Sequence, residues 1–200
     1  LPFAPVLDID HGVSGVIGDR AFGSDAQTVI HLSRAFRRGL KRAGLASTGK
    51  HYPGHGAVTA DSHHELPVDR RSMAEIERCE LRPFAALIAD GLESIMTAHV
   101  RYTAVDDRPA SLSAHWVKDI LRKRLGFQGV VFTDDLSMGG AAAVGSMEDR
   151  ARLALAAGSD MLLVCNDRPA SVTLLDALRD VRPRPTASVR LHALYRRQEL

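Results

Sequence analysis

The stretch GVVFTDD, residues 129–135, is the clearest strand of the sequence and decides the fold class. It is short, rich in β-branched and aromatic residues, and apolar at successive positions rather than at alternate ones. A continuous apolar run is typical of a strand in a parallel sheet that is covered on both faces. Two carboxylates, Asp134 and Asp135, follow the apolar part, where such a strand ends.

Four further runs have the same character, and helical patterns separate them. The expected strands are residues 3–9, 45–51, 94–100 and 160–165. The expected helices are residues 25–43, a unit from Ser72 to Gly91, 116–125, 146–157, 170–181 and 186–200. Ser24 or Asp25 should cap the first helix, and Ser72 with Glu75 has capping-box spacing. Pro83 should kink the second unit or begin a separate helix there. Strand, loop and helix thus repeat five times.

Two architectures have this repeat, an open doubly wound sheet and a (β/α)₈ barrel. No glycine-rich dinucleotide fingerprint follows any strand, which weakens the first. Polar residues follow the strands instead, at positions where a barrel converges its active site. These residues are Asp8, Asp10, Lys50, His51, His99 and Asp134. We therefore predict an α/β fold, a TIM-type (β/α)₈ barrel represented by about five of its eight βα units.

The domain organisation follows from that count. We expect residues 1–200 to be the carboxy-terminal portion of a single barrel domain, with a polar catalytic loop at 50–67 and a key strand at 129–135. The sequence begins without methionine, inside an expected strand, so we expect about three further units to precede it.

Composition excludes several function classes. The net charge of +2 and the scattered arginine pairs give no reason to expect a nucleic-acid partner. No apolar run approaches the ~20 residues of a membrane span, so we expect no membrane partner. Cys79 and Cys165 lack CxxC spacing, which argues against a disulfide framework or structural zinc and fits a reducing compartment.

The loop KHYPGHGAVTADSHHELP, residues 50–67, carries four histidines and little apolar content. Within it, Asp61 lies two residues before His63, so its carboxylate can accept the Nδ1 proton of the imidazole. The other ring nitrogen could then act as general acid or base. Asp61 could equally cap a turn beside a surface histidine, and the pattern does not decide between the two.

Other candidates lie at the strand ends. Either Asp134 or Asp135 could face the site while its neighbour caps the following helix. Lys50 and His51 are suited to binding hydroxyl groups, although Lys50 could also form an internal ion pair. We expect three other histidines to be structural or exposed: His55 shaping its own loop, His64 at the surface and His99 in the core. Alternatively, five strand-end residues could hold a divalent metal of a metal-dependent barrel hydrolase, namely His51, His55, His63, His99 and Asp134.

KHYPGHGAVTADSHHELP, followed about seventy residues later by GVVFTDDLSM, resembles the bacterial β-N-acetylhexosaminidases of glycoside hydrolase family 3. FAPVLDID, IGDRAFG, AHVRYT, RPASLS and DMLLVCN are also similar to segments of that family, so the resemblance spans residues 3–178. It implies a cytoplasmic enzyme of cell-wall recycling that removes N-acetylglucosamine from muropeptides carrying 1,6-anhydro-N-acetylmuramic acid. It also implies a muropeptide as the only partner, no cofactor, no resident metal, and a monomer at full length.

The resemblance further implies residue roles. Asp134 would be the nucleophile, His63 the acid/base and Asp61 its partner, while Arg20, Lys50 and His51 would bind the sugar. The reaction would be double displacement with retention, although an acetamido group could act as internal nucleophile instead. The family's earlier barrel units carry further sugar-binding residues. An inactive fragment that needs those strands is therefore an alternative.

Overall fold

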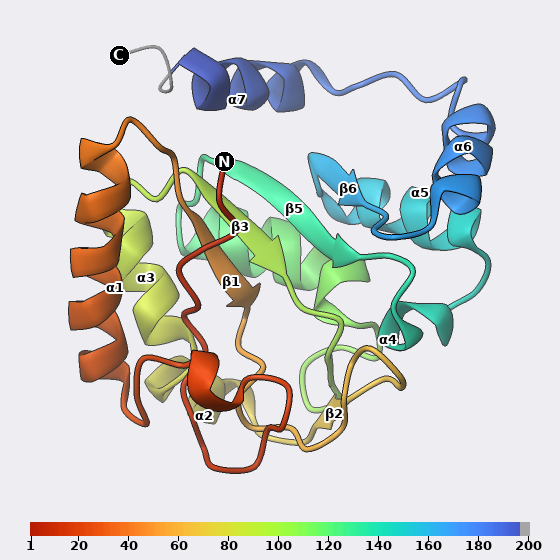
Figure 1. Ribbon diagram of the computed structural model, residues 1–200. Coiled ribbons are helices and arrows are strands. Elements are labelled where there is room, and N and C mark those ends of the chain that lie inside the picture. Colours follow the sequence, from red (N-terminus) through yellow and green to blue (C-terminus); the bar gives the residue numbers. More distant parts are fainter. Residues whose placement is uncertain (197–200) are drawn as a thin grey trace.

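The computed structural model describes residues 1–196 and contains a four-stranded sheet in which all neighbours are parallel. Its strands are β1 (Thr48–Tyr52), β3 (Ser94–Thr97), β5 (Val130–Asp135) and β6 (Met161–Leu163), side by side in chain order. A doubly wound sheet would reverse its order near the middle, whereas a barrel keeps it. All strands point toward the loops around α4 and β2 (Figure 1), so their carboxyl ends meet there.

The first expected strand, residues 3–9, is only partly a strand. It lies parallel to β1 and forms one isolated bridge, between Val6 and Lys50. The N–H of Leu7 donates to the carbonyl of Lys50 over 2.6 Å, and that of Thr48 donates to Ala4 over 2.8 Å. Pro5 has no N–H to donate, which limits regular pairing. The segment nevertheless extends the order of the sheet to five positions.

Helices surround this sheet. They are α1 (Ala26–Arg42), α2 (Met73–Arg78), α3 (Leu81–Ala89), α4 (Gly139–Ala142), α5 (Met147–Ala157), α6 (Arg168–Ala177) and α7 (Pro185–Arg196), together with the π-type helix η3 (His115–Arg124) and the 3₁₀ turns η1 (Gly18–Arg20) and η2 (Ala110–Leu112). The Asp25 side chain caps α1, and Ser72 with Glu75 forms the expected capping box of α2. Pro83 lies in the first turn of α3, so the unit consists of two helices.

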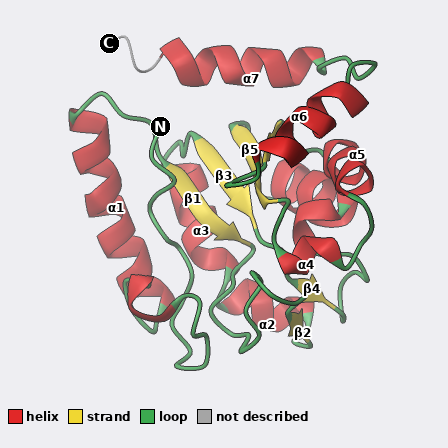
Figure 2. Cartoon of the chain, turned by 45° about the vertical axis from the view of Figure 1, so that its right-hand side comes forward, coloured by secondary structure: helices red, strands yellow, loops and turns green. Residues whose placement is uncertain are grey.

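Several boundaries differ from expectation, and the strands are shorter than expected: β1 begins at Thr48, β3 ends at Thr97 and β6 ends at Leu163. α6 ends at Ala177 rather than residue 181, with Leu178 as its C-cap. α7 begins at Pro185, and the expected continuation from 197 to 200 lies outside the described residues. α7 runs across the end of the sheet opposite the carboxyl-end loops (Figure 2), where Leu194 packs with Met96 and Phe132.

A second, two-stranded parallel sheet was not expected from the sequence. It joins β2 (Val68–Asp69) to β4 (Arg101–Tyr102). These strands are too short to give an apolar pattern. They connect the end of the histidine loop to the segment that follows β3, and so fix where that loop returns to the barrel.

The core lies beneath the histidine loop and is built from aromatic side chains. Tyr52 contacts Phe84 and Trp116 edge to face, with ring centroids 5.4 and 6.1 Å apart, and Tyr102 lies 4.9 Å from Trp116. All four side chains are fully buried. Since burial of one such side chain stabilises a fold by about 1.5–3 kcal/mol, these contacts anchor the end of β1 in the core.

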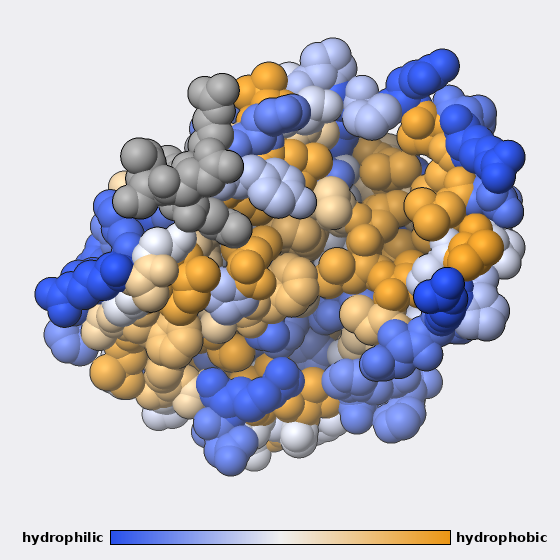
Figure 3. Space-filling model, turned by 45° about the horizontal axis from the view of Figure 1, so that its top comes forward, coloured by the Kyte–Doolittle hydropathy of each residue, from blue (hydrophilic) through white to orange (hydrophobic). Residues whose placement is uncertain are grey.

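The outer positions of the sheet remain open. Leu1 and Phe3 beside β1, and Met161 in β6, are between 36 and 40% exposed. Apolar residues also cover much of the middle of the face seen in Figure 3, with polar residues along its rim. Within residues 1–196, no helix has the length and apolar character needed to cross a membrane.

Candidate active site

A pocket of about 240 Å³ lies at the carboxyl ends of the strands. It is lined by Phe3, Val16, Arg20, Lys50, His51, His55, Ser62, His63, Met96, Asp134, Met138, Leu163 and Cys165. Five of the six predicted site residues are thus brought together from four separate segments. The sixth, Asp61, does not line the pocket but contacts it through His63.

Asp134 is half-buried at the end of β5, and the N–H of Asp135 donates to its Oδ1 over 2.8 Å. Burial alone would raise the pKa of Asp134, but the charges of His51, His99 and Lys50 and the Asp135 N–H outweigh it and lower the pKa. Asp134 is therefore an ionised carboxylate, with His51, His99 and Lys50 close enough to stabilise its charge.

Asp135, which the sequence could not distinguish from Asp134, has a different place. It accepts hydrogen bonds from the N–H of Ser137 over 2.9 Å and of Cys165 over 3.0 Å. It therefore stabilises the turn after β5 and the end of β6, and does not line the pocket.

His63 and Asp61 form the local pair that their spacing suggested. The ring Nδ1 lies 2.7 Å from Asp61 Oδ1, and the backbone N–H of His63 donates to the same oxygen over 2.8 Å. The backbone and ring hydrogen bonds of His63 lower the pKa of Asp61. Because an ionised carboxylate accepts the proton of Nδ1, Nε2 is the nitrogen available for proton transfer. The pair is accessible, with the His63 side chain 58% exposed.

The loop that carries His63 is anchored to α4 through its backbone. The N–H groups of Gly139 and Gly140 donate over 2.9 Å to the carbonyls of His63 and Ser62. A Cβ at Gly139 would lie 2.3 Å from the carbonyl oxygen of His64. This approach needs glycine, and it places His63 beside the turn that follows Asp134.

Lys50 is also half-buried. Burial and the charge of Arg20 lower its pKa, against the attraction of Asp134 and Asp8. Among residues 1–196, no carboxylate lies within ion-pair distance of Lys50, and the nearest opposing charges that act on it are those of Asp134 and Asp8. Arg20 is held by its own turn, where Nε and a terminal nitrogen donate to the carbonyl of Val16. Both cations can therefore donate to a polar ligand in the pocket.

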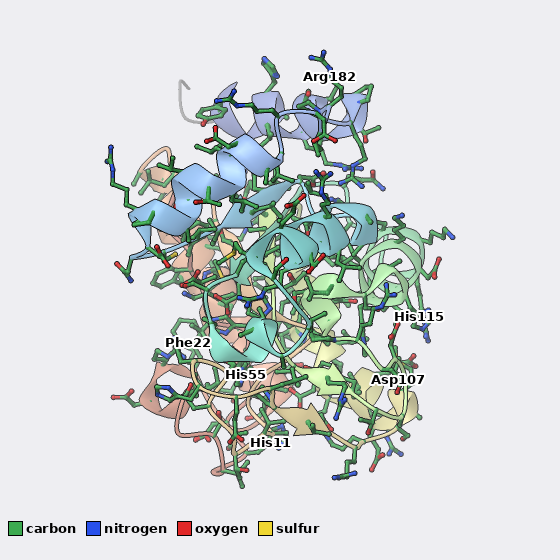
Figure 4. All side chains as sticks on the ribbon, turned by 90° about the vertical axis from the view of Figure 1, so that its right-hand side faces the viewer. His11, Phe22, His55, Asp107, His115 and Arg182 are labelled. Carbon is green, nitrogen blue, oxygen red and sulfur yellow. The ribbon has the colours of Figure 1, made fainter. Side chains whose placement is uncertain are left out.

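The other histidines fall into two groups. His99 is fully buried: its Nε2 donates to the carbonyl of Asp135 over 3.0 Å and its Nδ1 accepts from Ser111 over 2.7 Å, as expected for a core histidine. His64 is exposed, also as expected. His55 bonds Ser62 of its own loop over 2.9 Å, yet it also lines the pocket. Figure 4 shows His55 in the interior and His11 near the periphery.

The strand-end residues do not form the ligand group of the metal alternative. Among residues 1–196, the group of three potential ligands whose donor atoms lie within 4.8 Å of one another is His11, Cys79 and Glu80, none of which lines the pocket. Glu80 is already paired there with Arg71 and with His11.

The sequence did not single out Asp8 as a site residue. Its side chain is fully buried and accepts from the ring and N–H of His51 and from the N–H of His55. Its place at a strand end was visible in the sequence, but its partners, 43 and 47 residues away, were not.

Comparison with known proteins gives a consistent result. The family described as "Glycosyl hydrolase family 3 N terminal domain" matches residues 1–187. A curated beta-hexosaminidase of Methylococcus capsulatus is 50% identical over 198 residues, which cover 99% of this chain and 59% of that protein. One of Tolumonas auensis is 54% identical over 181 residues, covering 90% and 54% respectively.

A solved structure agrees in fold. NagZ from Neisseria gonorrhoeae, crystallised with N-trifluoroacetyl-D-glucosamine, superimposes with a TM-score of 0.85 at 42% identity, covering 96% of this chain and 55% of NagZ. The chain spans about half the length of the curated relatives it matches. The expected partial barrel is confirmed, and the chain belongs to glycosyl hydrolase family 3, of whose N-terminal domain it forms a part.

Proposed function

We propose that this chain supplies the catalytic pocket of a retaining β-N-acetylglucosaminidase. The observation that carries the proposal is the pocket itself, in which the ionised Asp134 and the Asp61-paired His63 face one cavity with Arg20 and Lys50. A carboxylate and a separate proton carrier are what glycosidic bond cleavage with a covalent intermediate requires.

In the first step, Asp134 attacks the anomeric carbon and the glycosidic bond breaks. Nε2 of His63 gives its proton to the departing oxygen, while Asp61 keeps Nδ1 protonated and the ring oriented. In the second step, His63 takes a proton from water, which displaces Asp134 from the sugar with a second inversion. Net retention follows. The use of histidine in place of the usual second carboxylate departs from the common scheme.

Arg20, Lys50 and His51 hold the sugar ring by hydrogen bonds to its hydroxyl groups. The substrate we infer is terminal N-acetylglucosamine on muropeptides that carry 1,6-anhydro-N-acetylmuramic acid, and the site of action is the cytoplasm. NagZ from Neisseria gonorrhoeae, which was crystallised with an N-acylated glucosamine, supports the sugar assignment.

The proposal is tested with an aryl N-acetyl-β-glucosaminide, which carries the 2-acetamido group of the natural sugar. Chromophore release is expected, and a 5-fluoro analogue should leave a glycosyl group on the peptide that contains residues 130–135. Fragmentation of that peptide in the mass spectrometer then distinguishes Asp134 from Asp135 as the attachment point, and we expect Asp134. Attachment at another carboxylate, or turnover through a bicyclic product of the acetamido group, contradicts the covalent route.

A second candidate, an inert partial barrel, is favoured by the apolar side chains exposed at both outer positions of the sheet. It predicts no turnover by residues 1–200 alone and turnover once further barrel strands are joined to them. Hydrolysis by the 200 residues alone excludes it. Full turnover after treatment with a chelator excludes the metal-dependent hydrolase.

A further inference from the structure

Asp8 is a buried carboxylate that the mechanism above does not use. Its side chain is 0% exposed and accepts three contacts: the N–H of His55 over 2.7 Å, the N–H of His51 over 3.2 Å, and Nδ1 of His51 over 2.7 Å. Burial alone would raise the pKa of Asp8, but His51 and His55 outweigh it and the pKa is lowered. Asp8 is therefore a charged acceptor at the back of the pocket wall.

The contact with the His51 ring decides which nitrogen reaches the pocket. An ionised carboxylate only accepts, so Nδ1 of His51 carries a proton. Nε2 has no protein partner among residues 1–196, is not among the buried unpaired atoms, and belongs to a residue that lines the pocket. In the neutral ring Nε2 can accept from a hydroxyl group, and in the protonated ring it can donate to one.

We propose that Asp8 is a positioning residue, which fixes the Nδ1–H form of His51 and so presents Nε2 of that ring to a hydroxyl group of the bound sugar. This inference rests on the proposed function, and it assigns to Asp8 a role in sugar binding rather than in bond cleavage. Asp8 does not itself line the pocket, so it acts only through His51.

The surroundings of the His51 ring indicate that Asp8 does more than hold the backbone of the loop. The ring is faced by Asp8 from the first segment, His55 from its own loop, and Asp134 from β5, while Lys50 and Arg20 line the same pocket. If Asp8 only held the backbone in place, its contacts with the N–H groups of His51 and His55 would be enough. The ring contact adds control of the tautomer, because without it either nitrogen could carry the proton.

The test uses Asp8→Asn, which keeps the shape and the acceptor for the two N–H groups but can turn an amide N–H toward Nδ1. The matched control is Asp69→Asn, a buried carboxylate outside the pocket that is paired with Arg71. Nitrogen-15 NMR of the imidazoles reports the His51 tautomer, with His51→Gln used to assign its signals. Titration with N-acetylglucosamine reports affinity whether or not the chain hydrolyses a substrate.

We expect Nδ1–H in the wild type and Nε2–H in Asp8→Asn. Affinity for N-acetylglucosamine should fall roughly 10- to 100-fold, as for other residues that orient a functional histidine. KM should rise more than kcat falls, and the double variant with His51→Gln should bind no more weakly than His51→Gln alone.

An unchanged tautomer with unchanged affinity in a folded Asp8→Asn overturns the inference, as does an equal loss of affinity in Asp69→Asn. If Asp8→Asn does not fold, the NMR spectrum of the wild type is the test. An unprotonated Nδ1 on His51 in that spectrum also overturns the inference. Failure of the proposed function gives a different result: the chain binds the sugar and His51 has the expected tautomer, but no substrate is hydrolysed.

Discussion

Two histidine–aspartate pairs of the same length contribute to one pocket, and they differ in burial. In both His51–Asp8 and His63–Asp61, Nδ1 lies 2.7 Å from a carboxylate oxygen. The side chains of the first pair are 7% and 0% exposed, and those of the second are 58% and 41% exposed. The buried ring is fixed and suited to holding a ligand, whereas the exposed ring can exchange protons with water. Environment therefore assigns the roles that residue type leaves equal.

The largest expected effect concerns Asp134, which lies in the same pocket as the two histidine rings. Asp134→Asn removes the proposed nucleophile and should leave the fold intact, since the amide can still accept from the N–H of Asp135. We expect kcat to fall on the order of 10⁴-fold or more. Steady-state chromophore release measures it, with unchanged thermal unfolding as the control. Activity close to that of the wild type would mean that Asp134 is not the nucleophile.

The exposed pair should affect proton transfer more than binding. His63→Ala is expected to lower kcat by about 10²- to 10⁴-fold with an aryl leaving group that needs protonation. With a highly acidic phenol as leaving group, the first step should be nearly unaffected, because no proton is required. Affinity for N-acetylglucosamine should change little. An equal loss of kcat with both leaving groups would contradict the role of His63 as an acid. It would also remove the difference in role between His63 and His51.

The loop between the two pairs depends on one close approach. A Cβ at Gly56 would lie 1.7 Å from the carbonyl oxygen of Ile9, so Gly56→Ala must push the loop from the segment that carries Asp8. We expect a loss of unfolding free energy of about 3 kcal/mol. Denaturant unfolding measures it.

Gly39→Ala is the control for this substitution, because Gly39 lies within α1 and has no heavy atom within 4 Å of the added Cβ. It should stabilise by roughly 0.5–1 kcal/mol. Equal effects at Gly39 and Gly56 would show that backbone freedom, not steric contact, matters at Gly56.

The smallest expected effect is a difference between the two pairs in how much each stabilises the fold at acidic pH. The pKa of Asp8 and that of Asp61 are both lower in the fold than the unfolded value of about 3.9. Each group therefore stabilises the fold above that value and loses its contribution as pH falls through the folded pKa. The stability gap between wild type and Asp8→Asn should shrink as the pH falls below about 4 and through the lowered folded pKa of Asp8.

For Asp61→Asn the gap should be small throughout, because water screens an exposed pair. Unfolding curves at several pH values compare the two variants. A pH-independent gap for Asp8→Asn would show that Asp8 acts as a neutral acceptor rather than as a charge.

Most of the barrel was predictable because its signals are local. The apolar run before Asp134, the cap at Asp25 and the capping box at Ser72 each depend on residues within four positions, and all three were found in the structure. The pairing of β2 with β4 gave no such signal, since strands of two residues have no period. At residues 3–9 we expected a regular strand. The segment pairs only partly with β1, because Pro5 has no N–H to donate.

The sequence by itself indicated which polar residues follow the strands, and it offered the His63–Asp61 pair as one of two interpretations of that spacing. Two residues separate those partners, so the turn alone brings them together. Only the tertiary structure decided that Asp134 rather than Asp135 faces the pocket and that Asp8 holds His51. The physical reason is distance along the chain. A contact across 43 residues depends on the register between the first segment and β1, which is set by packing of the whole core and not by any local pattern.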